Sequence, residues 1–214
     1  MRDKSGSFTK LNQPTLTATD LHTFLRTRRS IRRFRPDPVP DSVIESILHT
    51  ATFAPSAHNR QPWRFVVVTN PSVKMRLGEA ITSKMRADMQ AEGAGEADIE
   101  KRAALSLRRL DEAPLVIILC RDKTDVRADT PEETIMGVQS TALAGLQLLL
   151  AAHAEGLGGN WICWPLYAQK ATCAALELPE TWEPQAMYFF GYPAESPQLR
   201  DRKPMKEIVK TFNI

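Results

Sequence analysis

The stretch VQSTALAGLQLLLAA, residues 138–152, is apolar on nearly every side of the helix that its composition predicts. Thr130 suits the N-cap of this helix, Pro131 its first turn and Glu133 the third position of a capping box. Gly156–Gly159 ends it. A helix that is apolar all round must be buried on most sides. In a chain of only 214 residues, this predicts that part of the helix lies in a subunit interface.

Short apolar runs bounded by turn residues predict the strands of a central sheet. Leu115–Leu119 and Phe65–Val68 fit buried strands, and Trp161–Trp164 and Ala186–Phe190 are two further candidates. Apolar residues at helical spacing predict a first helix that begins near Thr19 or Asp20. They predict four further helices at about 42–51, 77–89, 99–110 and 168–176. Helices separate most of the strands, which indicates an α/β or α+β fold with helices on both faces of the sheet.

Ser42 and Glu45 fit a capping box at the start of the second helix, and Pro55 is expected to end that helix. Residues 1–16 have no periodicity and are interpreted as a flexible N-terminal arm. Residues 17–214 are then expected to form a single domain.

Charge and composition exclude several classes of protein. Twenty-eight Lys and Arg against 25 Asp and Glu leave a net charge of +3, too mild to indicate nucleic-acid binding. Residues 1–20 lack the apolar core of a signal peptide, and the apolar stretch 142–152 is too short to span a bilayer. Three cysteines without a CxxC motif suit a reducing compartment. We therefore expect a cytoplasmic protein that binds neither membrane nor nucleic acid.

The segment 26–35 holds six arginines in ten residues. It is either a solvated charge run, a nucleic-acid contact or an anion site, since the guanidinium fork matches a phosphate. Phe34 is its only aromatic residue, which disfavours single-stranded nucleic acid. The polar loop APSAHNRQPW at 54–63 is either a ligand cradle or a plain helix-to-strand turn. The C-terminal RDRK at 200–203, taken alone, is a basic surface tail.

Motifs for other chemistry are missing from the sequence. There is no GxGxxG fingerprint, Walker loop, HExxH or GxSxG, and the four histidines show no ligand spacing. We therefore expect no metal site, and no catalytic side chain stands out.

Four segments in combination resemble the FMN-dependent nitroreductase family. They are RRSIRRF (28–34), APSAHNRQPW (54–63), AEGLGGNWICWPL (154–166) and the GYP…RDR ending (191–202). The resemblance runs from about residue 20 to the C-terminus. It is strongest to the branch related to the C-terminal domain of deazaflavin-coenzyme glutamyl ligases, which lies near the flavin-fragmenting enzymes of cobalamin biosynthesis.

The resemblance implies an α+β fold with α/β-type layering, in which helices flank a mixed, mainly antiparallel sheet. It also implies an intertwined homodimer with FMN at the subunit interface. The implied activity is ping-pong hydride transfer from NADH or NADPH through flavin N5 to small nitro, quinone or ene acceptors. FMN would carry the chemistry, so no catalytic residue is assigned. A flavin-fragmenting enzyme, a deazaflavin-linked enzyme and a non-catalytic FMN-binding protein remain alternatives.

The resemblance also assigns site residues by motif. The first arginine segment would contact the phosphate, ribityl chain and pyrimidine edge, and the C-terminal pair would complete the phosphate site. The loop at 54–63 would line the isoalloxazine, and 158–166 would pass its N5 side. Because Pro165 has no N–H, the donor to the flavin would be a neighbour such as Trp164 or Leu166. Helices within Gly78–Leu110 would form the substrate lid, or else are ordinary surface helices. The implied cofactor-binding residues are Arg28, Arg29, Ser30, Arg32, Pro55, Ser56, Ala57, Asn59, Cys163, Trp164, Leu166, Arg200 and Arg202.

Overall fold

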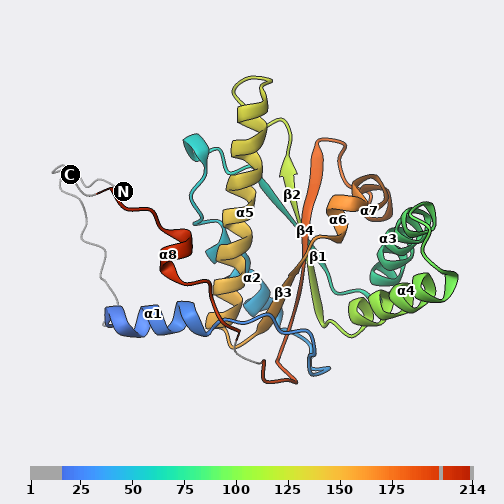
Figure 1. Cartoon of the computed structure of the whole chain (residues 1–214), viewed down its shortest axis with the longest axis horizontal. Coiled ribbons are helices and arrows are strands. Elements are labelled where there is room, and N and C mark those ends of the chain that lie inside the picture. The colour runs from blue at the N-terminus through green and yellow to red at the C-terminus, as the bar shows by residue number, and fades with distance from the viewer. Residues whose placement is uncertain (1–15, 198–199, 213–214) are drawn as a thin grey trace.

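A four-stranded antiparallel sheet in the order β1-β2-β4-β3 forms the centre of the protein (Figure 1). The computed structural model describes residues 16–197 and 200–212, so nearly all of the expected N-terminal arm lies outside the described residues. The one parallel pairing in this described part is an isolated bridge between Ser30 and Gly159. The predicted α+β class, with a mainly antiparallel sheet, is confirmed. The strands are β1 (Trp63–Val68), β2 (Leu115–Asp122), β3 (Gly158–Ile162) and β4 (Trp182–Gly191).

Helices cover both faces of the sheet (Figure 1). On one face α2 and α5 pack over the sheet, and on the other face lie α3, α6 and α7, with α4 packed against α3. Every residue of β2 is buried, as a continuous apolar run predicts for a central strand. The helices are α1 (Ala18–Thr27), α2 (Asp41–Ala51), the 3₁₀ turn η1 (Ala57–Asn59), α3 (Pro71–Ala91), α4 (Glu96–Asp111), α5 (Pro131–Ala154), α6 (Trp164–Tyr167), α7 (Gln169–Leu176) and α8 (Met205–Ile208).

The long helix α5 begins and ends as predicted, with the Thr130 side chain accepting a hydrogen bond from the Glu133 N–H. One side packs on the sheet through residues such as Ala144 and Leu148. The other side exposes apolar residues of this chain, among them Leu143 and Leu146, which are 43% and 49% exposed. This arrangement fits a helix that a second subunit would cover.

The length of α5 bears on the expectation that its apolar stretch is too short to span a bilayer. By length and composition, this is the one helix in the described part of the chain that could cross a membrane. Its 24 residues include an 18-residue window of mean hydropathy 1.5, of which 44% is buried inside the protein. The apolar stretch 142–152 is short, but the helix that contains it is not. Core helices of globular proteins pass the same test, so the property is weak evidence for a membrane.

Several predicted boundaries are wrong. Helix α2 starts at Asp41 with Pro40 at its N-cap and no side-chain cap, so the expected capping box of Ser42 and Glu45 does not form. A proline at the N-cap fixes the extended backbone that the helix start needs, and no side-chain cap is required. Helix α1 has Thr17 at its N-cap, with Asp20 as the third residue of a true capping box. Trp164 belongs to α6 rather than to the third strand, because Pro165 favours a helical first turn.

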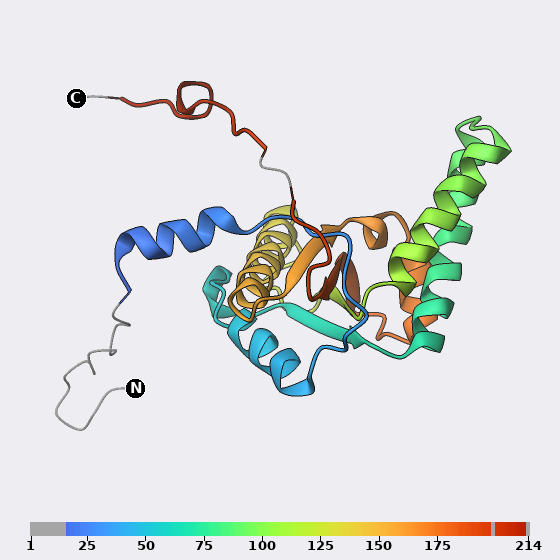
Figure 2. The same cartoon turned by 90° about the horizontal axis from the view of Figure 1, so that it is seen from below.

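Helices α1 and α8 project from the body of the protein (Figure 2). Neither α1 nor α8 contains a buried residue. Both carry apolar side chains that are exposed in the single chain, for example Leu25 at 50% and Phe212, after α8, at 78%. These projecting segments would gain buried apolar area against a second subunit.

Candidate functional site

The arginine-rich segment lies along the free edge of β3. The Ile31 N–H donates to the Gly159 carbonyl at 3.1 Å, beside the bridge between Ser30 and Gly159. This close approach requires glycine in β3, because a Cβ at Gly158 would lie 2.7 Å from the Cβ of Ile31. Gly158 of the GLGG stretch therefore allows the arginine segment to approach the sheet edge.

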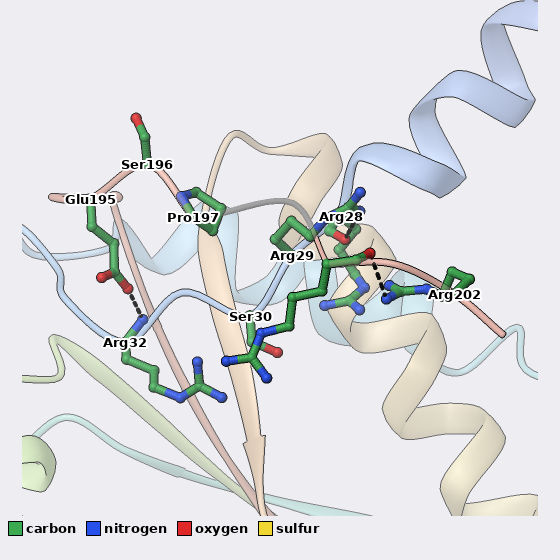
Figure 3. A pocket seen from close by; sticks show the side chains of 9 residues that line it. Arg28, Arg29, Ser30, Arg32, Glu195, Ser196, Pro197 and Arg202 are labelled. Atoms are coloured by element: carbon green, nitrogen blue, oxygen red, sulfur yellow. Dashed lines mark hydrogen bonds between the residues drawn. The ribbon is translucent and has the colours of Figure 1, made fainter.

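The residues that follow β4 bind the same arginine segment. The Arg35 N–H donates to the Tyr192 carbonyl at 2.8 Å, and the Ala194 N–H donates to the Arg33 carbonyl at 3.0 Å. The Glu195 carboxylate accepts a hydrogen bond from the backbone N–H of Arg32 at 2.6 Å (Figure 3). It also accepts one from the backbone N–H of Arg33 at 3.2 Å. Two segments more than 160 residues apart in sequence thus become one structural unit.

This unit surrounds a pocket of about 400 Å³. Figure 3 shows arginine side chains from both segments around it. The six residues predicted from the first arginine segment and the C-terminal pair, for the phosphate, ribityl chain and pyrimidine edge, all line this one pocket. Its lining consists of Arg28, Arg29, Ser30, Arg32, Glu195, Ser196, Pro197, Arg200 and Arg202.

The electrostatics of the pocket favour an anion. Burial and the neighbouring charges of Arg29 and Arg202 lower the pKa of the Arg28 guanidinium below its usual value. The Nε of Arg29 is buried and has no hydrogen-bond partner among the described residues. Positive charges gathered in one pocket repel each other, and an anion between them removes this repulsion. A phosphate also offers acceptors for the unpaired donors.

The loop expected to line the isoalloxazine has a strained backbone. His58, Asn59 and Gln61 all have positive φ values, of 52°, 53° and 55°. Strain of this kind gathers at ligand sites and persists only where surrounding contacts enforce it. Here the Ser56 Oγ accepts from the Gln61 N–H at 3.0 Å, and the Ala57 N–H donates to the Ser140 Oγ of α5 at 3.1 Å.

The structure does not bring this loop to the arginine pocket of the same chain. In this loop the Ala57 N–H contacts Ser140 in the N-terminal half of α5, whereas Thr27, next to Arg28, contacts His153 near the C-terminus of the helix. Thirteen residues of helix separate these contacts, which is about 20 Å at ~1.5 Å per residue. The residues predicted to hold the two ends of one FMN therefore contact α5 at two well-separated positions, near its middle and near its C-terminus.

The third predicted set lies where β3 leads into α6. Cys163 is a partly buried free thiol at the N-cap of α6, and Trp164 packs edge-on against Phe189 at 6.3 Å between ring centroids. Leu166 is exposed, and its N–H donates to the Cys163 carbonyl at 3.0 Å. Of the two backbone donors considered for the flavin, Trp164 is the one without this internal hydrogen bond.

The proposed lid, Gly78–Leu110, forms most of an antiparallel helical hairpin, α3 and α4. With α6 it encloses a cavity of about 720 Å³. Glu195, in contrast, is a residue of the arginine pocket that sequence reasoning missed. It lies between the recognised GYP and RDR motifs, but a single glutamate in a loop carries no signal of the backbone N–H groups that it will bind.

Comparisons with known proteins agree with this architecture. A protein-family model described as "Nitroreductase family" matches residues 25–192 of this chain. A protein named NADH dehydrogenase from Thermus thermophilus is 32% identical over 226 residues, 92% of this chain and 98% of that protein. A 5,6-dimethylbenzimidazole synthase from Rhodospirillum rubrum is 34% identical over 172 residues, 78% of this chain and 79% of that protein. An FMN-dependent nitroreductase from Clostridium difficile R20291 matches with a TM-score of 0.67 and 25% identity, covering 89% of this chain and 98% of that chain.

The chain therefore belongs to the nitroreductase family. The family resemblance inferred from the four sequence segments is confirmed. Its particular branch, next to the deazaflavin-linked ligases, stays a prediction.

Proposed function

We propose that this protein is an FMN-dependent oxidoreductase that reduces small organic acceptors, such as nitro, quinone or ene compounds, with NADH or NADPH. The observation that carries the proposal is the single pocket lined by arginines from two distant segments. For a nitro acceptor the overall reaction consumes one NAD(P)H and one proton and yields a nitroso compound, water and NAD(P)⁺. Bound FMN would supply the ability to accept a hydride and pass it on.

The chain's own residues would bind and orient the cofactor. Arg28, Arg202 and the buried Nε of Arg29 would donate to the phosphate, with Ser30 and Arg32 along the ribityl chain and pyrimidine edge. The backbone at Cys163 and Trp164 would face the reactive side of the flavin. Because these groups bind rather than react, the proposed function needs no catalytic triad or acid–base pair.

We further propose that the active unit is a homodimer in which each FMN site takes residues from both subunits. Within one chain the isoalloxazine loop lies about 20 Å along α5 from the arginine pocket, by the ~1.5 Å rise per residue of a helix. A second copy packed across the exposed apolar side of α5 would supply the loop to the neighbouring pocket. The same contact would cover the apolar residues of that side, including Leu143 and Leu146.

We also propose that residues 17–214 act as one domain in the cytoplasm, without membrane or nucleic acid. The three cysteines are free, which suits a reducing compartment.

The first experiment is the absorption spectrum of the purified protein, with the chromophore released by denaturation and identified. The proposal expects FMN at close to one per subunit and NAD(P)H-dependent reduction of an uncharged acceptor such as a quinone. A colourless protein that also fails to bind added FMN contradicts it. A yellow protein that reduces no acceptor would instead be a non-catalytic flavin carrier.

A matched pair of variants tests the arginine pocket. Arg28→Ala and Arg202→Ala should each weaken FMN binding by about 1–3 kcal/mol, the cost of losing a hydrogen bond between charged groups. Arg33→Ala is the control, because Arg33 belongs to the same basic run but its side chain lines a different pocket. Riboflavin, which has no phosphate, should bind all four proteins alike.

The relative from Rhodospirillum rubrum favours a second candidate, fragmentation of FMN. In that reaction reduced FMN reacts with oxygen and is consumed. Incubation with FMN, NADPH and oxygen, followed by chromatography for 5,6-dimethylbenzimidazole, separates the two functions. Release of the base identifies a fragmenting enzyme, whereas FMN that survives many turnovers identifies a reductase.

A further inference from the structure

The cavity beneath the α3–α4 hairpin combines an apolar wall with unpaired cations. Its volume is about 720 Å³, within the ~300–1,000 Å³ range of small-molecule sites. Met85 and Met89 of α3 line it opposite Leu105 of α4, and Trp164 and Tyr167 of α6 add aromatic rings. Tyr167 is 77% exposed, so its ring is free to contact a ligand. Thioethers and aromatic rings of this kind favour a flat, apolar molecule.

Two arginines of α4 give the cavity its charge. Arg102 and Arg109 are seven residues apart, two helical turns, and therefore lie on the same face of the helix. Neither has an ion-pair or hydrogen-bond partner within the described ranges 16–197 and 200–212. Two neighbouring arginines, in contrast, do have carboxylate partners. Arg86 of α3 pairs with Glu100 at 2.7 Å, and Arg108 approaches Glu112 at 3.8 Å.

The acidic residues of the cavity leave Arg109 in particular without a nearby counter-charge. Asp88 already forms an ion pair with Lys84. Glu92 is the C-cap of α3 at the tip of the hairpin, whereas Arg109 lies near its base, thirteen residues beyond the start of α4. That is about 20 Å along the helix, more than the ~8 Å Debye length at physiological salt. The cavity therefore has a net positive end beside the sheet.

We propose that this cavity is the acceptor subsite and that Arg102 and Arg109 select acceptors with a planar aromatic body and an anionic group such as a carboxylate. The proposal rests on the oxidoreductase function proposed above, because α6 joins this cavity to the segment assigned to the flavin. The aromatic body would stack against Trp164 and Tyr167, and the anion would pair with an arginine fork.

The test compares two acceptors of nearly equal shape, 4-nitrobenzoate and the neutral 4-nitrobenzamide, with the FMN-loaded protein. Arg102→Gln and Arg109→Gln should each raise KM for 4-nitrobenzoate by about three- to tenfold. This loss lies between the energies typical of an exposed ion pair and of a buried hydrogen bond between charged groups. KM for 4-nitrobenzamide should stay unchanged. Arg108→Gln is the matched control, because Arg108 neighbours Arg109 in sequence but lines other surface grooves.

Equal KM changes for the two acceptors, or no change for either, would overturn the proposal. A change in KM for NADPH alone would also overturn it and would assign the arginines to the nicotinamide donor. Calorimetry with the redox-inert 4-methylbenzoate separates this proposal from the proposed function. If the protein binds FMN but reduces neither nitro compound, the reductase function fails. In that case, carboxylate binding that Arg109→Gln weakens and Arg108→Gln does not would still support an anion-selective cavity.

Discussion

The Glu195 carboxylate accepts a 2.6 Å hydrogen bond from the backbone N–H of Arg32 and lines the pocket that the Arg32 side chain also lines. Glu195 therefore acts on the pocket in two opposing ways. Its hydrogen bonds to the backbone hold the arginine segment in place, while its negative charge reduces the attraction of the pocket for a phosphate. A substitution that separates hydrogen bonding from charge would show which effect is larger.

Glu195→Gln keeps a side-chain oxygen that can accept from the Arg32 N–H but removes the charge. We expect this variant to bind FMN about two- to fivefold more tightly at low salt, the range of an exposed charge interaction. The gain should shrink as salt is added, because salt screens the repulsion. Glu195→Ala, which also loses the hydrogen bonds, should bind less tightly than Glu195→Gln. Fluorescence titration of FMN at two salt concentrations measures both variants, and weaker binding by Glu195→Gln would contradict the account.

Gly145 of α5 lies directly against the phenol of Tyr188 on β4. A Cβ at this position would meet the Tyr188 Oη at 2.0 Å and the Cζ at 2.9 Å. We expect Gly145→Ala to lower the free energy of unfolding by about 1–3 kcal/mol through overpacking. Tyr188→Phe removes the closest atom, so the double variant should lose less stability than the sum of the two single changes. Urea unfolding of the four proteins tests this, and strict additivity would mean that α5 shifts to avoid the contact.

The sequence predicted the main elements of the fold because their patterns are local. The apolar run Leu115–Leu119 lies within β2, and Thr130 and Pro131 marked the true start of α5. The predicted cap at Ser42 failed because a capping-box pattern competes with the conformation that Pro40 enforces, and residue spacing does not rank the two. The short helix α6 was missed because four residues carry no helical periodicity.

The candidate site was predictable only in part. The arginines at 28–32 and 200–202 could be grouped through their family motifs, and the structure places them in one pocket. That the loop with Ala57 packs against Ser140, far from this pocket, follows from tertiary contacts that no motif encodes. The charge of the α3–α4 cavity was also hidden, because Arg102 and Arg109 resemble any solvated arginines until their partners are known.

The exposed side of α5 gives a prediction about assembly. Leu146→Glu places a charge on a surface that is 49% exposed in the single chain, so the subunit itself should remain folded. If this side is the subunit contact, the variant should elute as a 24.0 kDa monomer instead of a dimer of twice that mass. It should also lose FMN, since each site would lack the loop of the second subunit. Light scattering after gel filtration and the flavin absorbance report the two effects together.

Met75→Glu is the control for that experiment. Met75 is an apolar residue of α3 that is 61% exposed and lies on a different helix from the proposed contact. This variant should keep both the mass and the flavin of the parent protein. Retention of the dimer by Leu146→Glu would place the subunit contact elsewhere and would leave the separated FMN residues without an explanation.

His153 links α5 to the projecting helix α1 and should make stability depend on pH. Its ring stacks on Phe24 at 4.9 Å, and its Nε2 lies 3.2 Å from the Thr27 Oγ1. Burial, and then the charge of Arg28, lowers the pKa of His153 below its usual 6.5. The folded protein therefore binds this proton less readily than the unfolded chain does. Its contribution to stability is complete above pH 6.5 and is lost as the pH falls from there through the lowered pKa.

The comparison of the flavin-free protein with His153→Phe isolates this effect. Phenylalanine keeps the stacking on Phe24 but cannot titrate. Between pH 7.5 and 5.5 the parent should therefore lose more unfolding free energy than the variant, measured by urea denaturation at each pH. Bound FMN should reduce the difference, because its phosphate would offset the charge of Arg28 and raise the pKa of His153 toward its usual value. Parallel losses in the two flavin-free proteins would mean that His153 titrates alike in the folded and unfolded chains, and the contacts between α1 and α5 would then be insensitive to pH.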